Sequence, residues 1–272
     1  MRHRSAVAAL VAVVALLCPT APTGAQTEAV TFHDLAATPG VPYGPFPETW
    51  AVVTQSNSFV YAMVPAGYNQ KPHHHDQEQF TLGVGGSLDY LIGSSKHRLG
   101  SQVAGLPPSN VLHAMINEGS QAASMMEFQP VRRPEWLPPN PPVPPQPRSA
   151  QPMTVLPDQT VTMDFALSSD GWQTDSSGAR VKVLSGKTIR ASFWNLSAAK
   201  AVVDLSAKPS AHERFVFVMS GQIRAVIGST SREIGPKMLM VLAPSATGVT
   251  LQSLGRAGSE IVVFEPIDAA SR

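Results

Sequence analysis

Short apolar runs separated by turn-forming residues recur along most of the chain. Gly, Pro, Ser and Asn break these runs, and no long stretch repeats its apolar residues at the helical period. Runs this short, bounded by turn residues, are typical of strands. The clearest are SFVYAMV (58–64), QFTLGV (79–84), RFVFVM (214–219), MLMVLA (238–243) and EIVVFEPI (260–267). The pattern predicts an all-β protein built as a sandwich or a barrel.

The runs also occur as two similar sets. GGSLDYLIG at 85–93 matches SGQIRAVIG at 220–228, and the aligned residues are 135 positions apart. LPPSNVLH at 106–113 matches LAPSATGV at 242–249 with a separation of 136, so the alignment slips by one residue only. Self-similarity at a nearly constant separation predicts a duplicated β domain.

A proline-rich segment separates the two sets. It reads FQPVRRPEWLPPNPPVPPQPRSAQP and runs from Phe128 to Pro152. Proline cannot donate to a β-ladder, so such a segment is expected to run extended between folded parts. We therefore expect an N-terminal domain at 30–128, a proline-rich linker at 129–152 and a C-terminal domain at 153–272.

The N-terminal residues have the pattern of a targeting segment. Charged residues at 2–4 precede a small-apolar run, Ala6 to Leu17, and small residues follow before Gln26. The run is shorter than the roughly 20 residues that span a bilayer. It predicts a signal peptide over 1–25 and a mature periplasmic or secreted chain that begins near Gln26. A lipid anchor at Cys18 is the alternative.

Composition limits the chemistry that is available. Cys18 is the one cysteine, so the predicted mature chain has neither disulfides nor thiolate ligands. Hydrophobic residues make up 43% of the chain and charged residues 14%, which suits a packed core. The net charge is +1 without a basic cluster, which argues against nucleic acid as a partner.

Three consecutive histidines lie in KPHHHDQEQFTLGVGG, residues 71–86. In an extended segment alternate side chains face opposite ways. His73, His75 and Gln79 would then share one face, and His74 and Glu78 would turn away. The face with His73, His75 and Gln79 would leave room for a guest molecule, because it continues with the small residues Thr81, Gly83 and Gly85.

GYNQKPHHHDQEQFTLGVGG resembles the first motif of the cupins, and LPPSNVLHAMIN resembles the second. The family pattern has glycine where this chain has Asn110. The resemblance implies a bicupin, with two tandem cupin-type jelly-roll barrels. It also implies one divalent metal ion held by His73, His75, Gln79 and His113; these residues do not distinguish Mn, Fe, Zn, Ni and Co.

Position 79 departs from the commonest family residue, which is glutamate. Three neutral imidazoles and a neutral amide leave the ion its full +2 charge, which favours Lewis-acid chemistry. We therefore expect an exported metal-dependent lyase or isomerase acting on a small oxygenated substrate, such as a sugar acid or a hydroxy-carbonyl compound. A metal-dependent dioxygenase of the bicupin type and a non-catalytic metal-dependent binding protein are the alternatives.

The C-terminal repeat lacks a comparable ligand set. Counting back from Gly221 by the spacing of the first motif places Lys208, Ser210 and Arg214 at the ligand positions. Val249 takes the place of His113. We expect that this barrel has lost its metal and that its cavity has filled into a core. A structural or dimer-forming role is expected, and a metal-free sugar-binding pocket is the alternative.

No acid or base is assigned from the sequence. Tyr61, Tyr90 and Glu127 flank the two motifs and are candidates, although a residue of this kind is more often an ordinary strand residue than a catalyst. As partners we expect a small-molecule substrate, with a homodimer through the cupin sheets as the oligomer to test for, and neither a nucleic acid nor a membrane span.

Overall fold

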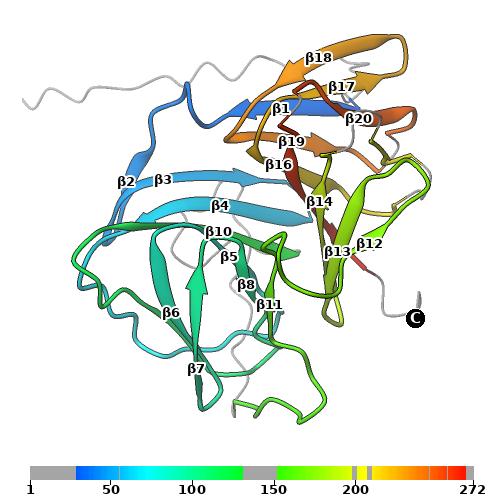
Figure 1. Ribbon diagram of the computed structural model, residues 1–272. Coiled ribbons are helices and arrows are strands. Elements are labelled where there is room, and N and C mark those ends of the chain that lie inside the picture. The colour runs from blue at the N-terminus through cyan, green and yellow to red at the C-terminus, as the bar shows by residue number, and fades with distance from the viewer. Residues whose placement is uncertain are drawn as a thin grey trace, which may run out of the picture.

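A computed structural model describes residues 29–54, 56–130, 152–197, 201–206, 210–244, 246–255 and 257–267. This part of the chain forms 21 strands in four antiparallel sheets and contains no helix, which confirms the all-β prediction (Figure 1). No helix here is long and apolar enough to cross a membrane. The predicted signal peptide and nearly all of the predicted linker lie outside the described residues.

The first barrel combines a seven-stranded and a three-stranded sheet. The larger has the order β11-β8-β5-β10-β4-β3-β2, and the smaller has the order β7-β6-β9. The strands are β2 (Val41–Tyr43), β3 (Phe46–Val53), β4 (Asn57–Val64), β5 (Phe80–Gly85), β6 (Ser87–Ile92), β7 (Ser95–Gly100), β8 (Val103–Gly105), β9 (His113–Ile116), β10 (Ala123–Pro130) and β11 (Thr162–Asp164).

The second barrel repeats this arrangement. Its larger sheet has the order β1-β19-β16-β21-β14-β13-β12, and a four-stranded sheet has the order β15-β20-β17-β18. The strands are β1 (Val30–Asp34), β12 (Gln173–Thr174), β13 (Arg180–Ser185), β14 (Ile189–Asn195), β15 (Val202–Asp204), β16 (Arg214–Ser220), β17 (Ile223–Ile227), β18 (Thr230–Ile234), β19 (Met238–Leu242), β20 (Val249–Ser253) and β21 (Glu260–Pro266).

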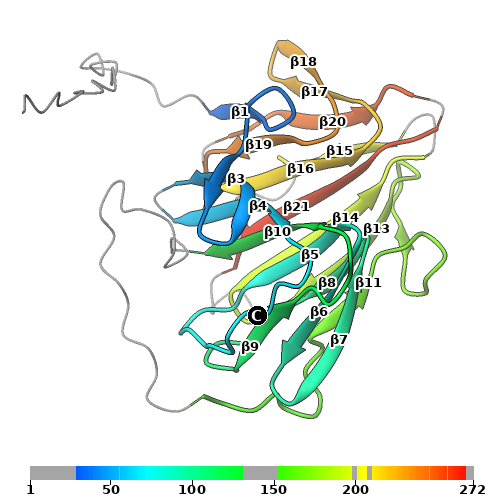
Figure 2. The same cartoon turned by 90° about the vertical axis from the view of Figure 1, so that its left-hand side faces the viewer.

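Each large sheet ends in a strand from the other half of the sequence (Figures 1 and 2). β1 pairs with β19 of the second barrel over five residues, from Val30 opposite Leu242 to Asp34 opposite Met238. β11 pairs with β8 of the first barrel. The predicted boundaries at 30–128 and 153–272 follow the sequence repeat, whereas these two edge strands pair across them. The exchange covers one edge of each sheet, which would otherwise expose unpaired backbone groups.

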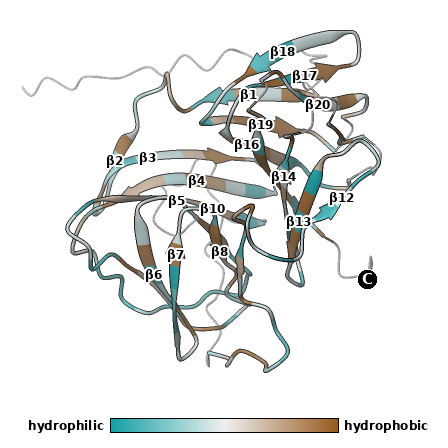
Figure 3. Ribbon diagram, viewed as in Figure 1, coloured by the Kyte–Doolittle hydropathy of each residue, from teal (hydrophilic) through white to brown (hydrophobic). Residues whose placement is uncertain are grey.

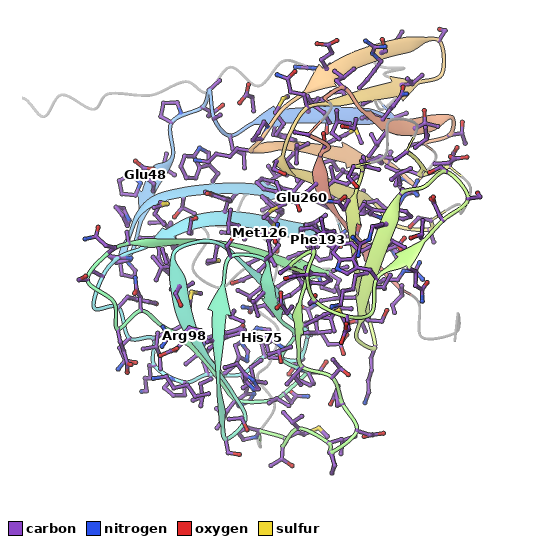
Figure 4. The ribbon with its side chains drawn as sticks, in the orientation of Figure 1. Glu48, His75, Arg98, Met126, Phe193 and Glu260 are labelled. Atoms are coloured by element: carbon purple, nitrogen blue, oxygen red, sulfur yellow. The ribbon has the colours of Figure 1, made fainter. Side chains whose placement is uncertain are left out.

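The two large sheets pack face to face through a core shared by both barrels. Met126 on β10 and Phe193 on β14 both belong to it, and Figure 4 places them where the two barrels meet. The ring of Phe264 on β21 packs against Phe80 and Phe128 of the first barrel, with centroids 5.1 and 5.2 Å apart. Because alternate residues of a strand face opposite ways, the other face of each large sheet is left for its own barrel interior.

Each barrel interior holds a separate core. In the first barrel it includes Val60, Leu88 and Met125, and in the second it includes Val216 and Met240. Figure 3 shows the difference in hydropathy between interior and outer strands: β19 at the interior is brown, whereas the short outer strand β12 is teal. The continuous apolar runs of the sequence are therefore strands buried on both faces.

We predict that Phe264→Ala will destabilise both barrels together. The side chain is fully buried and contacts aromatic rings of the other barrel, so its loss leaves a cavity at the shared core. The expected decrease in the free energy of unfolding is about 3–5 kcal/mol, measured by chemical denaturation. Val41→Ala is the control, since Val41 is 62% exposed. A loss for Phe264→Ala as small as the control's would contradict the shared core.

Candidate metal centre

His73, His75 and His113 come together at one end of the first barrel. His73 and His113 form an isolated antiparallel bridge, in which each backbone N–H donates to the other's carbonyl oxygen, at 3.0 and 2.8 Å. One ring nitrogen from each of the three histidines lies within 4.8 Å of the others. In Figure 4 His75 lies among the strands of this barrel. The two cupin-like motifs therefore meet in space, as the resemblance implied.

The segment that carries His73 and His75 is not the extended strand that we expected. The chain bends at Asp76–Gln77, and β5 begins only at Phe80. Simple alternation along a strand therefore does not account for the shared direction of the ligand side chains. Backbone pairing with the second motif holds them instead, through the bridge to His113 and through the Asn110 N–H, which donates to the His75 carbonyl oxygen at 2.7 Å.

The backbone conformation at Asn110 shows why asparagine can replace the glycine of the family pattern. Its φ is 62°, in the left-handed region that favours glycine. Asparagine is the non-glycine residue that enters this region most readily, together with aspartate. The turn that carries the His75 bond is therefore kept although the glycine is absent.

The three imidazoles are oriented by backbone carbonyl groups. Their Nδ1 atoms lie 3.3, 2.8 and 2.9 Å from the carbonyl oxygens of Lys71, Gln77 and Val111, each two residues from its histidine. A ring that donates through Nδ1 presents the lone pair of Nε2, which is the arrangement of metal-binding histidines.

The buried end of the cluster is His113. This residue is 1% exposed, and its Nε2 has no hydrogen-bond partner among the described residues. Burial, and then the neighbouring His75 and His73, lower the pKa of His113 well below its usual value. A neutral imidazole with a buried, unsatisfied lone pair fits a metal ion.

Gln79 contributes its carbonyl oxygen to the same place. Gln79 Oε1 lies 2.8 Å from His75 Nε2. With its proton on Nδ1, toward the Gln77 carbonyl oxygen, His75 would present the lone pair of Nε2 to Gln79 Oε1, and two acceptors at this distance repel unless a positive charge lies beside them. A divalent cation supplies that charge. The donor set of three imidazoles and one amide oxygen therefore fits the metal that the resemblance implies.

A buried polar network surrounds the Gln79 amide. Gln129 Nε2 donates to Gln79 Oε1 at 2.6 Å, while Gln79 Nε2 donates to Thr81 Oγ1 at 3.2 Å and to Tyr90 Oη at 3.0 Å. In this arrangement the amide oxygen faces the imidazoles and the amide nitrogen faces the two hydroxyl groups. The sequence did not point to Gln129, because it lies 50 residues away from Gln79.

Glu127 lies behind Gln129 in this network. Gln129 Nε2 also donates to Glu127 Oε1 at 3.0 Å. Burial raises the pKa of Glu127 to about 8, with the Gln129 bond opposing the shift, so Glu127 is a neutral acid at pH 7. Burial also raises the pKa of Tyr90, as does the nearby Glu127. Both residues act on the site through Gln79 and Gln129.

Tyr61, the third candidate acid or base, points away from the site. Its ring belongs to the core shared by the two large sheets, where it stacks with Phe217 at a centroid distance of 5.9 Å. Tyr61 is 2% exposed. It is a packing residue of the interface between the barrels.

Two glycines near Gln79 allow close packing of the barrel. A Cβ at Gly83 would lie 2.2 Å from the Gly100 carbonyl oxygen, so glycine here allows β7 to approach β5. Similarly, a Cβ at Gly105 would lie 2.5 Å from the Tyr90 ring. Gly105 thereby leaves space for the tyrosine that binds the Gln79 amide.

Glu78 turns away from the histidines, as alternation predicted, and binds the second barrel. Its carboxylate accepts hydrogen bonds from the Lys187 N–H at 2.7 Å and from the Thr188 N–H at 2.6 Å, in the turn between β13 and β14. A Cβ at Gly186 would lie 2.4 Å from Glu78 Oε2, so glycine is needed there. The residue next to Gln79 thus joins the region of the three histidines to the second barrel.

The equivalent place in the second barrel has other residues. Val249 pairs with Ile227 as His113 pairs with Ile92, and Arg214 begins β16 close to where Gln79 precedes β5. Lys208 lies outside the described residues. Across the described ranges, the three histidines are the one group of His, Cys, Asp or Glu side chains that could hold a metal ion.

Comparison with known proteins shows the fold only. The chain matches no family model and no curated protein. Among solved structures, a putative glyoxylate-induced protein from Pseudomonas aeruginosa is 12% identical with a TM-score of 0.65, covering 89% of this chain and 90% of that chain. AerE from Microcystis aeruginosa is 13% identical with a TM-score of 0.61, covering 85% and 98%. A variant of oxalate decarboxylase from Bacillus subtilis is 11% identical with a TM-score of 0.61, covering 89% and 78%. The chain has the cupin-type jelly-roll fold of these proteins.

We predict that His113→Ala will abolish most metal binding. It removes one of four proposed ligands, and none of the other three is anionic. Elemental analysis of the purified protein is the measurement, and His33→Ala on β1 is the matched control. Arg214→Met should leave about one metal per chain. Two metals per wild-type chain, or loss of metal in Arg214→Met, would contradict the assignment to the first barrel.

We predict that Glu127 makes stability fall as pH rises. Between pH 4.5 and about 8 the unfolded chain releases the Glu127 proton while the folded chain keeps it, so the free energy of unfolding decreases through this window and levels off above it. Glu127→Gln removes this dependence, so its stability relative to wild type should increase with pH. Urea denaturation of chelator-treated protein at about pH 5 and about pH 8.5 measures it. Exposed Glu118→Gln is the control, and a Glu127→Gln difference independent of pH would show that the carboxyl ionises normally.

Proposed function

We propose that this protein is an exported metal-dependent enzyme, a lyase or isomerase that acts on a small oxygenated substrate. One divalent ion is held by His73, His75, Gln79 and His113. When bound, it supplies Lewis-acid chemistry, which polarises a carbonyl group or acidifies a bound water or hydroxyl. Sugar acids and hydroxy-carbonyl compounds are the proposed substrate classes.

The observation that carries this proposal is the neutral donor set with its matched orientation. His75 Nε2 and Gln79 Oε1 face each other at 2.8 Å, and Gln129 and Tyr90 bind the amide with its oxygen toward the histidines. Because no ligand is anionic, the charge of the ion is left for the substrate. An anionic or strongly polar oxygen is therefore the group that this centre attracts most.

The buried network has a defined task in this proposal. In the metal-free protein, burial raises the pKa of Glu127 to about 8 and its carboxyl group accepts from Gln129, so it places little negative charge behind the amide at pH 7. Tyr90 and Glu127 act as positioning residues, since each acts on the ligands through Gln79 or Gln129. The proton donor or acceptor for the substrate stays unassigned.

The solved structures support the substrate class. One is an oxalate decarboxylase and another is described as glyoxylate-induced, and both names refer to small oxygenated acids. This agrees with a centre whose uncompensated charge favours carboxylate and carbonyl oxygens.

The test is turnover with and without oxygen. The metal-loaded protein is assayed with oxalate, glyoxylate, D-glucuronate and D-galacturonate in air and under anaerobic conditions. We expect turnover that is independent of oxygen. Gln79→Glu should keep the metal and lower turnover by about tenfold or more, because its carboxylate offsets the charge that the substrate uses.

Two outcomes would overturn the proposal. Turnover that stops without oxygen would favour a dioxygenase. Full metal loading without any reaction across the panel would favour a binding protein.

Gln79→Leu is the matched comparison for Gln79→Glu, because it removes the amide ligand without adding charge.

The location of the enzyme is part of the proposal. The signal-like pattern before Gln26 supports export. N-terminal sequencing of the protein from the periplasm or medium of an expressing bacterium should find a chain that begins near Gln26. Retention of Met1 would contradict export by this signal.

A further inference from the structure

The second barrel keeps a cavity of about 490 Å³. We expected this space to have filled into a core, and for this end of the barrel that expectation is wrong. Side chains of β13, β14, β15 and β21 line it, together with Arg214 at the start of β16. Its volume is within the range of about 300–1,000 Å³ that is typical of small-molecule sites.

The cavity lies at the end of the barrel that corresponds to the metal centre. Arg214 stands in the wall at the counterpart of the Gln79 position. Leu205 also lines it and donates its backbone N–H to the carbonyl oxygen of Val249, the counterpart of His113. The second barrel thus has a cavity where the first barrel has the metal centre, and different side chains line it.

The charged groups of the wall balance one another. Arg190 and Arg214 are cations, and Asp204 and Glu265 are anions. Arg190 Nε lies 2.5 Å from Glu265 Oε1. Burial lowers the pKa of Arg214, whereas Glu265 and Asp204 raise it, which places both carboxylates near its guanidinium. A ligand with a net charge gains little from such a wall, whereas hydroxyl groups, which both donate and accept, can bond to both kinds of group.

The uncharged part of the wall combines polar residues with apolar ones, and it includes an indole ring. Trp194 lies on the same face of β14 as Arg190 and Ser192, because these positions alternate with the residues packed in the shared core. Val181 and Val263 flank it on β13 and β21. An aromatic ring beside polar groups suits a ring-shaped ligand that has C–H faces and hydroxyl edges.

We propose that this cavity binds an uncharged polyhydroxylated ring, a molecule of the monosaccharide class, without a metal. Hydroxyl groups of the ligand lie against the charged residues, and its C–H face lies against Trp194. The site is distinct from the metal centre, whose ligands all come from the first barrel. Binding at this cavity can therefore be tested independently of the proposed reaction.

Titration calorimetry of the full mature chain tests this proposal. The probes are D-glucose, D-galactose and D-xylose, with D-glucuronate and D-glucosamine as charged counterparts. We expect at least one of the three neutral sugars to bind one per chain, and more tightly than either charged counterpart. Metal-free His113→Ala should bind it equally well, since the cavity does not use the metal.

Two variants locate the binding within the cavity. Ser192→Phe fills the cavity from the wall, and Arg214→Met removes a wall cation; each should weaken binding by about tenfold or more. The matched control is Arg224→Met, because Arg224 is an exposed arginine that pairs with Glu233 on the outer hairpin. Circular dichroism verifies that each variant is folded, and Ser192→Phe keeps the test valid if Arg214→Met does not fold.

Four results would overturn the proposal. The first is the absence of heat for all three neutral sugars up to about 50 mM, since even millimolar affinity is then detectable. The second is loss of binding in metal-free His113→Ala, which would place the ligand at the metal centre. The third is unchanged binding in folded Ser192→Phe, and the fourth is tighter binding of a charged counterpart.

Discussion

The face-to-face packing of the two seven-stranded sheets is the constraint on which the rest of this structure depends. Phenylalanines of both barrels interlock there, and Phe264 packs against Phe80 and Phe128. Because one face of each large sheet is used for this contact, the opposite face must form a barrel interior. β1 and β11 extend the two sheets across the halves, so neither large sheet is complete without the other half of the chain.

The two barrels use equivalent positions for different chemistry. In the first, lone pairs of three imidazoles and one amide converge, and a buried network of Gln129, Tyr90 and Glu127 holds the amide. In the second, paired cations and anions line a cavity beside an indole ring. The same fold thus carries a cluster of lone pairs in the first barrel and a cavity wall with balanced charges in the second.

Glu78 connects these two regions. It lies in the sequence between His75 and Gln79, two of the proposed ligands, and its carboxylate binds the turn that joins β13 to β14. Both of these strands line the cavity of the second barrel. A buried carboxylate loses much of its hydration, and backbone N–H donors replace it here, so the contact is specific in direction as well as in sign.

The sequence by itself determined the all-β fold, the duplication and the four proposed metal ligands. These follow from local patterns: short apolar runs, a repeat separated by 135 to 136 positions, and histidines at cupin-like spacing. Only the tertiary structure decided the exchanged strands, the orientation of Gln79 by Gln129, the role of Glu78 and the cavity beside Arg214. Strand alternation gave the direction of Glu78 correctly, yet it failed to describe the bent segment around His75. The physical reason is range, because a pattern records the preferences of neighbouring residues, whereas these features arise from contacts between residues that are distant in sequence and meet only when the sheets pack.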